Sequence, residues 1–239
     1  MSGRPKLILQ KALARSRWDI HRGIPLTIHR EQLLRRIGDP IVLDVGANEG
    51  LYAVCLRTAG FRGEIHSFEP LPDAFQLLSG RALVDEKWYA VQAACGESVG
   101  TLAIHQSQNS VSSSILAMNE THAKAAPSSV FVGEPIECAV TTIDAYVAGH
   151  LNDSAPIYMK MDVQGFEDRV LRGAERSLSR IAAIESEISL TALYEGQASW
   201  LELIGGLAED FELVDVRPGF RDQQARLLQA DVLLLRRGI

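Results

Sequence analysis

The sequence predicts an α/β fold in which helices cover both faces of a mostly parallel sheet. Short apolar runs alternate with amphipathic stretches from residue 41 to residue 211, which is the pattern of repeated strand–helix units. A glycine-rich turn follows the first apolar run, where folds of this class bring backbone N–H groups close to a ligand. The last two runs, residues 211–216 and 231–236, are joined without a helix, so they should form an antiparallel hairpin.

Each expected element has a local reason. Residues 41–43 form a continuous apolar run, typical of a strand buried on both faces, and Gly60 ends the helix that follows at residues 51–58. Thr142 is expected to cap a helix over residues 142–147. By the same patterning, strands are expected at residues 64–68, 88–94, 101–105, 136–140, 157–161 and 181–188, and helices at residues 73–83, 168–178 and 200–207.

The composition is that of an ordinary globular protein. With 46% apolar and 23% charged residues, the 239-residue chain suffices for one large domain. The formal net charge of -6 gives no electrostatic reason to expect nucleic acid. Three cysteines without a C-x-x-C spacing argue against a zinc site and favour a reducing compartment, which we take to be the cytoplasm. No apolar run reaches the roughly 18 residues of a transmembrane helix.

Residues 1–38 differ from the rest of the chain in charge. Leucines and Trp18 are interleaved with the charges, so we expect a basic helical segment, with a second short helix over residues 31–37. Two interpretations stay open: a helical cap with its basic face in water, or a basic surface that contacts an anionic membrane or acceptor. Asp19 and Glu31 oppose nine basic residues, namely Arg4, Lys6, Lys11, Arg15, Arg17, Arg22, Arg30, Arg35 and Arg36.

The middle of the chain has weaker patterns. Residues 106–114 are polar and short-chained, which indicates a loop near a site. Residues 117–133 are interpreted as a lid-like excursion. We expect acceptor choice to be set in this part of the chain.

The densest motif runs from residue 41 to residue 52, with Asp44, Gly46, Asn48 and Gly50 as its fixed points. This spacing differs from the G-x-G-x-x-G of dinucleotide sites. An acidic residue at the first turn would repel a pyrophosphate and would favour a cationic or amino-bearing ligand. S-adenosylmethionine carries both a sulfonium and an α-amino group, so it fits this turn.

Acidic residues follow the ends of several expected strands. Glu69 ends the second strand, where its carboxylate would accept both ribose hydroxyls, although Glu69-Pro70 also resembles a helix cap. Carboxyl ends of parallel strands meet at one sheet edge. We therefore expect Asp44, Glu69, Asp162 and Glu187 to converge there. Asp231 should join them, because an antiparallel last strand begins at the same edge, and Lys160 is expected to pair with one of these acidic residues.

Several stretches together resemble the FkbM family of S-adenosylmethionine-dependent methyltransferases. They are DVGANEGLY, SFEP, KMDVQGFEDRVLRGA, ALYEGQ and GFRD followed by LLQADVLLLR, and they span roughly residues 41–236. The resemblance implies a Rossmann-like class I methyltransferase fold with a seven-stranded sheet. It also implies methyl transfer to a hydroxyl of a sugar, glycolipid or natural-product acceptor. Residues 1–38 would then be a separate basic segment, and residues 39–239 the methyltransferase domain.

The resemblance and the strand ends together define an expected cofactor site. The methionine end is expected at the glycine turn and the ribose at Glu69, with the adenine wall near Cys95 and Gly96. The predicted cofactor-binding residues are Asp44, Gly46, Ala47, Asn48, Gly50, Tyr52, Glu69, Pro70 and Ala94.

Methyl transfer to an oxygen needs the hydroxyl to lose its proton. Asp162 is the first candidate for a general base, His105 the second, and Glu187 a further catalytic candidate. Asp162 could instead cap the next helix, and Glu187 could instead accept a hydrogen bond from the loop that carries Tyr194. A second route uses Mg²⁺ held by Asp162, Glu187 and Asp231, although no metal-binding motif is evident. A non-catalytic binding or scaffolding protein on the same fold is the alternative function.

Overall fold

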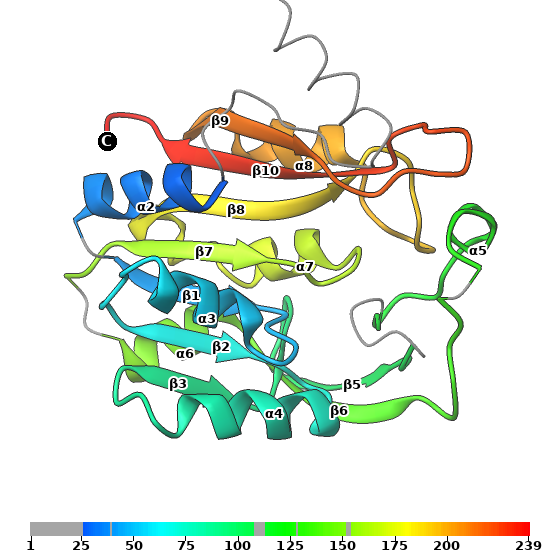
Figure 1. Ribbon diagram of the computed structural model, residues 1–239, viewed down its shortest axis with the longest axis horizontal. Helices are drawn as coiled ribbons and strands as arrows, with labels where there is room; N and C mark the ends of the chain where they lie inside the picture. Colours follow the sequence, from blue (N-terminus) through cyan, green and yellow to red (C-terminus); the bar gives the residue numbers. More distant parts are fainter. Residues whose placement is uncertain (1–25, 39, 108–112, 128, 152–153) are drawn as a thin grey trace, which may run out of the picture.

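The computed structural model describes residues 26–38, 40–107, 113–127, 129–151 and 154–239. Its main sheet has seven strands in the order β3-β2-β1-β7-β8-β10-β9. Neighbours from β3 to β8 run parallel, whereas β10 is antiparallel to both β8 and β9. The predicted fold class, including the C-terminal hairpin, is confirmed (Figure 1).

The strands of the main sheet are short and apolar at its centre. They are β1 (Ile41–Val45), β2 (Ile65–Phe68), β3 (Trp88–Val91), β7 (Ile157–Met161), β8 (Ile181–Ser189), β9 (Phe211–Pro218) and β10 (Gln229–Arg236). All five residues of β1 are buried, as expected for a central parallel strand. Asp44 was expected to end this strand, but it lies within β1, one residue before the observed end at Val45.

Helices cover both faces of the main sheet. On one face lie α2 (Leu26–Ile37), α3 (Leu51–Thr58) and α4 (Pro72–Ala82), and on the other lie α6 (Ile143–His150), α7 (Glu167–Arg172) and α8 (Trp200–Leu207). Two apolar clusters fill the layers: Leu56 and Leu78 pack on Val42 in the first, and Ile143 and Val170 pack on Met159 in the second. Burial of this apolar surface is the main stabilising term of the fold.

One predicted strand is divided between two sheets. Residues 88–94 were expected to be continuous, but β3 ends at Val91 and Ala94–Cys95 forms β4 of a second sheet, ordered β4-β6-β5. The break is a tight turn, because the Ala93 N–H donates to the Val91 carbonyl at 3.0 Å. The other strands of this sheet are β5 (Gly100–Ile104) and β6 (Ile136–Thr141), which pair antiparallel.

Two predicted helices differ from those observed. The helix expected at residues 168–178 is the shorter α7, because a Cβ on Gly173 would overlap the Gly96 carbonyl oxygen and the chain must turn there. A 3-10 turn, η2 (Leu178–Arg180), follows it. The helix expected at residues 31–37 is α2, which begins five residues earlier. Thr142 caps α6 as predicted, accepting the Ala145 N–H at 3.0 Å.

The middle excursion contains a helix that its sequence pattern does not show. Helix α5 (Glu120–Ala125) begins at Asn119, whose side chain accepts the N–H groups of Thr121 and His122. Two backbone bonds tie the excursion to the loop after β8: Asn119 N–H to Leu193 O, and Glu195 N–H to Ala117 O. In Figure 1 it lies beyond the carboxyl edge of the sheet, where β1, β2 and β7 end.

Most of the basic N-terminal segment lies outside the described residues. Its last helix, α2, packs on the sheet through Leu33 and Leu34. Arg30 does not contribute to a basic surface, because it is buried and paired with Glu185. No helix in the described part of the chain is long and apolar enough to cross a membrane.

Candidate active site

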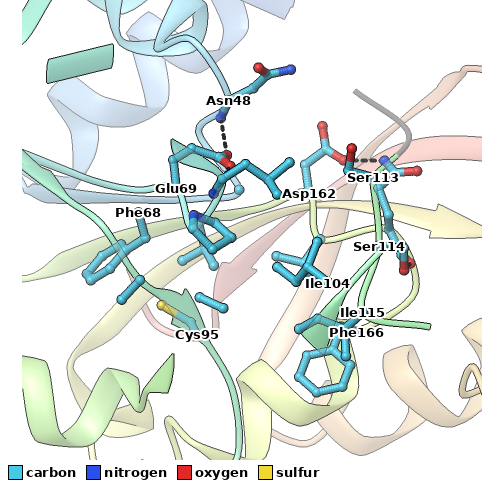
Figure 2. Close-up of a pocket in the computed structure, with 18 residues that line it drawn as sticks. Asn48, Phe68, Glu69, Cys95, Ile104, Ser113, Ser114, Ile115, Asp162 and Phe166 are labelled. Atoms are coloured by element: carbon cyan, nitrogen blue, oxygen red, sulfur yellow. Dashed lines mark hydrogen bonds between the residues drawn. The ribbon is translucent and has the colours of Figure 1, made fainter. Parts of the chain in front are cut away.

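A pocket opens at the carboxyl edge of the sheet, between the ends of β1, β2 and β7 and the start of the second sheet (Figure 2). Its empty volume, open solvent included, is about 680 Å³. It is lined by Val45, Gly46, Asn48, Phe68, Glu69, Pro70, Leu71, Ala93, Ala94, Cys95, Ile104, Ser113, Ser114, Ile115, Asp162, Val163, Gln164 and Phe166. Of the acidic strand-end residues expected to converge here, Glu69 and Asp162 line the pocket, whereas Asp44, Glu187 and Asp231 do not.

We call Gly46, Asn48 and Glu69 the glycine end of this pocket. Gly46 has φ +75°, and a Cβ there would overlap the carbonyl oxygen of Asp162, so only glycine lets β1 turn this close to β7. Asn48 also has positive φ, 48°. Gly50 does not line the pocket, and its missing side chain leaves room for Leu78 and Trp88.

Glu69 is held by the backbone on both sides. Its Oε2 accepts the Asn48 N–H at 2.8 Å and its Oε1 accepts the Leu71 N–H at 2.9 Å (Figure 2). The second bond lies at the start of α4, so the predicted capping role is present together with the pocket position. Burial raises the pKa of Glu69, against the effect of these two N–H groups. One lone pair on each oxygen stays available for a ligand hydroxyl.

Asp44 lies behind the glycine turn and does not line the pocket. It is fully buried, its Oδ1 is 3.2 Å from Lys160 Nζ, and its Oδ2 accepts the Ser67 hydroxyl at 3.2 Å. Lys160 also donates to the Gly46 carbonyl at 2.9 Å. Burial acts to lower the pKa of Lys160, but the Asp44 and Asp162 carboxylates outweigh it and raise that pKa. The predicted pairing of Lys160 with an acidic residue of a strand end is confirmed. Through its bond to the Gly46 carbonyl, Lys160 also holds the glycine turn in place.

Tyr52 also faces away from the pocket. Its hydroxyl donates to Glu185 at 2.8 Å, beside the Tyr158 hydroxyl, which donates to the same carboxylate at 2.6 Å. Arg30 completes the set with its Nε donating to Glu185 at 2.8 Å. Burial acts to raise the pKa of Glu185, but the hydrogen bond and charge of Arg30 outweigh it and lower that pKa. This buried cluster anchors α2 and α3 to β7 and β8.

We call Asp162, Gln164 and Glu187 the acid end of the site. Asp162 lines the pocket, and its side chain is 41% exposed. The Gln164 amide donates to Asp162 Oδ1 at 2.7 Å and to Glu187 Oε2 at 3.2 Å. A cap from Asp162 onto α7 is not observed in the described structure, where Glu167 instead accepts the Val163 and Gly165 N–H groups.

Glu187 sits deeper than Asp162. Its Oε2 accepts the Gln229 amide at 2.5 Å, and the loop carrying Tyr194 reaches it through Gln164, which accepts the Tyr194 hydroxyl at 2.6 Å. Burial, together with the charges of Asp162, Glu167 and Asp231, raises the pKa of Glu187 to about 9. Glu187 is thus protonated near neutral pH. Burial likewise raises the pKa of Glu167 to about 7.

The remaining predicted residues divide into two groups. Pro70 and Ala94 line the pocket, whereas Ala47 is buried beside it. His105 is not a lining residue; its ring stacks on Phe131 with 4.8 Å between centroids. Gln164 was not among the predicted site residues, and two of the three partners of its amide lie 23 and 30 positions away.

The residues proposed as magnesium ligands form no such centre. Within the described ranges, no group of three or more His, Cys, Asp or Glu side chains is arranged to hold a metal ion. The Gln164 and Gln229 amides both donate to Glu187 Oε2, and the Gln164 amide also donates to Asp162 Oδ1.

The model of the Methyltransferase FkbM domain matches residues 44–221, which include the glycine turn, Glu69 and the acid end. The chain belongs to the FkbM methyltransferase family. It is 28% identical over 217 residues to the 2-O-methyltransferase NoeI of Sinorhizobium fredii, covering 87% of this chain and 85% of that one. This FkbM-family chain is therefore a methyltransferase, and the family resemblance stated above is confirmed.

Solved structures similar to this methyltransferase share little sequence with it. An rRNA methylase from Streptococcus thermophilus is 14% identical with a TM-score of 0.48, covering 92% of this chain and 99% of that one. TehB from Haemophilus influenzae is 9% identical with a TM-score of 0.49, covering 95% and 67%. A SAM-dependent methyltransferase from Aquifex aeolicus is 12% identical with a TM-score of 0.41, covering 86% and 88%.

Proposed function

We propose that this chain is an S-adenosylmethionine-dependent O-methyltransferase whose acceptor is a hydroxyl of a sugar, glycolipid or related natural product. The main observation in favour of this cofactor is the buried Glu69 carboxylate, which two backbone N–H groups hold at a pocket of about 680 Å³. An oxygen acceptor is supported by the relative named for 2-O-methylation.

The lining residues fit the parts of S-adenosylmethionine. The free lone pairs of Glu69 suit two ribose hydroxyls, and the apolar side chains of Leu71, Ile104 and Phe166 suit an adenine ring. The amino-acid end would lie at Gly46 and Asn48, where a glycine turn brings the backbone close to a ligand. Asp44 would act indirectly there, by holding Lys160 against the Gly46 carbonyl.

Asp162 is the residue best placed to take the acceptor proton. When bound, S-adenosylmethionine supplies a methyl carbon activated by a sulfonium sulfur, which leaves with the electron pair of the C–S bond. The acceptor oxygen forms the new bond to carbon, and the Asp162 carboxylate receives the hydroxyl proton. Glu187 is protonated at neutral pH and His105 does not line the pocket, so neither is proposed as the base.

Free thiols support a reducing compartment, and we place the enzyme in the cytoplasm. Cys55, Cys95 and Cys138 form no disulfide. Burial raises the pKa of Cys95, which makes this pocket-lining thiol unreactive.

The cofactor is tested by calorimetry of S-adenosylhomocysteine into the purified protein. We expect low-micromolar binding, weakened at least tenfold by Glu69→Gln, because the amide offers one acceptor oxygen where the carboxylate offers two. Glu86→Gln, an exposed change after α4, is the matched control and should leave the affinity unchanged. No binding to the wild-type protein would exclude the proposed cofactor site.

The acceptor class is tested by transfer of a tritiated methyl group from S-adenosylmethionine to a panel of neutral methyl glycosides. Asp162→Asn should lower turnover by a factor of about 10² to 10⁴, which is the usual contribution of a general base. The affinity for S-adenosylhomocysteine should stay at the wild-type value. Transfer to amine acceptors and to none of the hydroxyl acceptors would overturn the O-methyl assignment.

A further inference from the structure

The Gln164 side chain connects the pocket to the buried carboxyl below it. Its Nε2 donates to Asp162 Oδ1 at 2.7 Å and to Glu187 Oε2 at 3.2 Å, while its Oε1 accepts the Tyr194 hydroxyl at 2.6 Å. Both amide hydrogens and the amide oxygen are therefore used within one site. Only the NH₂ group can donate to two carboxyl oxygens, so the orientation of the amide is determined.

The partner that fixes this orientation is rigid. Tyr194 is only 1% exposed, and its ring lies edge-on to His122 with 5.1 Å between centroids. It also lies against Gly165, where a Cβ would come within 2.9 Å of the Tyr194 ring. Glycine at this position thus lets the phenol approach Gln164 closely.

The Gln164 backbone is fixed as well. Its φ of 54° is in the left-handed region, which costs a non-glycine residue about 1 kcal/mol or more unless the surroundings hold it. The Ser114 hydroxyl donates to the Gln164 carbonyl at 2.8 Å, linking this turn to the second sheet's side of the pocket. Strain of this kind persists at positions with a functional requirement.

Asp162 lies in a strongly charged environment. The titratable groups that face it are Lys160, Asp44, Glu167, Glu187, Asp231 and Tyr194, from five elements and one loop. Lys160 Nζ, the cation of this set, is 4.0 Å from Asp162 Oδ2 and is closer to Asp44. The direct hydrogen-bond donor to Asp162 is therefore Gln164.

We propose that Gln164 is a positioning residue, which holds the Asp162 carboxylate in its reactive place, and that Tyr194 sets the amide orientation this requires. The inference rests on the proposed role of Asp162 as base. A donor to the charged form stabilises that form and fixes the direction of its free oxygen. Gln164 itself passes no proton, since an amide at this position only donates and accepts hydrogen bonds.

The deciding experiment follows the Asp162 Cγ resonance by NMR across pH in the full chain labelled with ¹³C-aspartate. Gln164→Glu replaces the amide donor by a second carboxyl, so the Asp162 midpoint should move up by at least one pH unit. Tyr194→Phe keeps the ring contacts but removes the hydroxyl that orients the Gln164 amide. It should raise the Asp162 midpoint by a smaller amount. Gln76→Glu, an exposed change on α4, is the control and should not move it.

Each result bears on the proposal. Unchanged Asp162 midpoints in both Gln164→Glu and folded Tyr194→Phe would overturn it. Calorimetry on the Tyr194→Phe sample, whose changed residue does not line the pocket, should show S-adenosylhomocysteine affinity within threefold of wild type. Loss of that affinity together with unmoved midpoints would instead make Gln164 part of the cofactor site. If wild-type protein binds no S-adenosylhomocysteine, the proposed function fails, whereas the NMR titration still decides whether Gln164 controls Asp162.

Discussion

The two ends of the pocket are held by different kinds of contact. At the glycine end, Glu69 is bound by the N–H groups of Asn48 and Leu71, so backbone geometry fixes the carboxylate. At the acid end, the carboxyls of Asp162 and Glu187 are joined by the Gln164 amide, so side chains fix one another. The first arrangement depends on a turn. The second depends on several side chains from separate elements.

This difference affects how each end responds to change. A backbone N–H is present whatever residue replaces Asn48, so the Glu69 carboxylate keeps that donor unless the turn itself moves. At the acid end, removing the Gln164 side chain leaves the buried Tyr194 hydroxyl without its acceptor, at about 1–3 kcal/mol. At the glycine end, we therefore expect the largest effects from substitutions that add a side chain where two backbone segments meet. At the acid end, we expect even conservative changes of a polar side chain to have large effects.

The largest expected effect comes from Gly46→Ala. This change tests whether the close approach of Gly46 to the Asp162 backbone is needed at both ends of the pocket. The added Cβ would overlap the Asp162 carbonyl oxygen, and φ +75° is strained for alanine. We expect S-adenosylhomocysteine affinity to fall by more than about 100-fold, equivalent to roughly 2.7 kcal/mol, and the melting temperature to fall. Calorimetry and thermal unfolding measure the two effects.

The control for this change is Gly149→Ala, on the exposed side of α6. A Cβ there meets nothing within 4 Å, so the helix should be unchanged or stabilised by about 0.5–1 kcal/mol. Wild-type affinity in Gly46→Ala would show that β1 and β7 can separate at this edge. The two ends of the pocket would then be independent.

The same contrast explains which parts of the site the sequence predicted. The glycine turn, Glu69 and Pro70 follow directly after apolar strands, so a strand-end rule finds them. The same rule finds Asp162 and Glu187, but it cannot show which of them is protonated, because that depends on burial among charges from other strands. Tyr52 was assigned to the cofactor from its place near the turn, whereas its hydroxyl faces Glu185, 133 residues away.

A second substitution tests whether both ends of the pocket depend on the buried cluster around Glu185. Arg30→Met removes the buried cation from Glu185, which lies two residues before Glu187 and accepts the Tyr52 hydroxyl of the helix after the glycine turn. Breaking a buried pair by removing one partner costs about 3–5 kcal/mol, which urea unfolding at pH 7 would measure. Gln32→Met, exposed on the same helix, is the control and should cost far less.

The pH dependence of this effect has a definite sign. The folded-state pKa of Glu185 is lowered, so its contribution to stability is present above the unfolded value of about 4.3 and is lost as pH falls through the folded value. The deficit of Arg30→Met should therefore shrink in acid. Addition of Glu185→Gln to Arg30→Met should recover part of the stability at pH 7. A deficit that is constant with pH would mean that packing, and not the charge of Arg30, is lost.

A smaller effect of opposite direction is expected at the acid end. The folded-state pKa of Glu187 is about 9 and its ordinary value is 4.5, so the native chain keeps a proton that the unfolded chain releases. Stability from this group therefore falls as pH rises between these values. Glu187→Gln keeps an oxygen for the amides of Gln164 and Gln229, and it removes this pH dependence.

We expect Glu187→Gln to stabilise the protein at pH 8 by about 1–3 kcal/mol, measured by urea unfolding between pH 5 and pH 9. Glu195→Gln, exposed in the loop that carries Tyr194, should change neither stability nor its slope with pH. If Glu187→Gln is destabilising at pH 8, Glu187 is ionised in the native state. The acid end would then carry one more negative charge than the raised pKa of Glu187 gives it.

The smallest expected effect is that of His105→Gln. This change tests whether Asp162, and not His105, takes the proton of the acceptor hydroxyl. The His105 ring stacks on Phe131, and its backbone pairs with Ser114 through bonds of 2.9 and 3.1 Å that glutamine keeps. S-adenosylhomocysteine affinity should stay within twofold of wild type. Tritiated methyl transfer to the best glycoside of the panel should stay within about threefold, against a loss of about 10² or more for Asp162→Asn. A hundredfold loss in His105→Gln at unchanged cofactor affinity would move the proton acceptor to His105, just after β5, and make Asp162 a structural group.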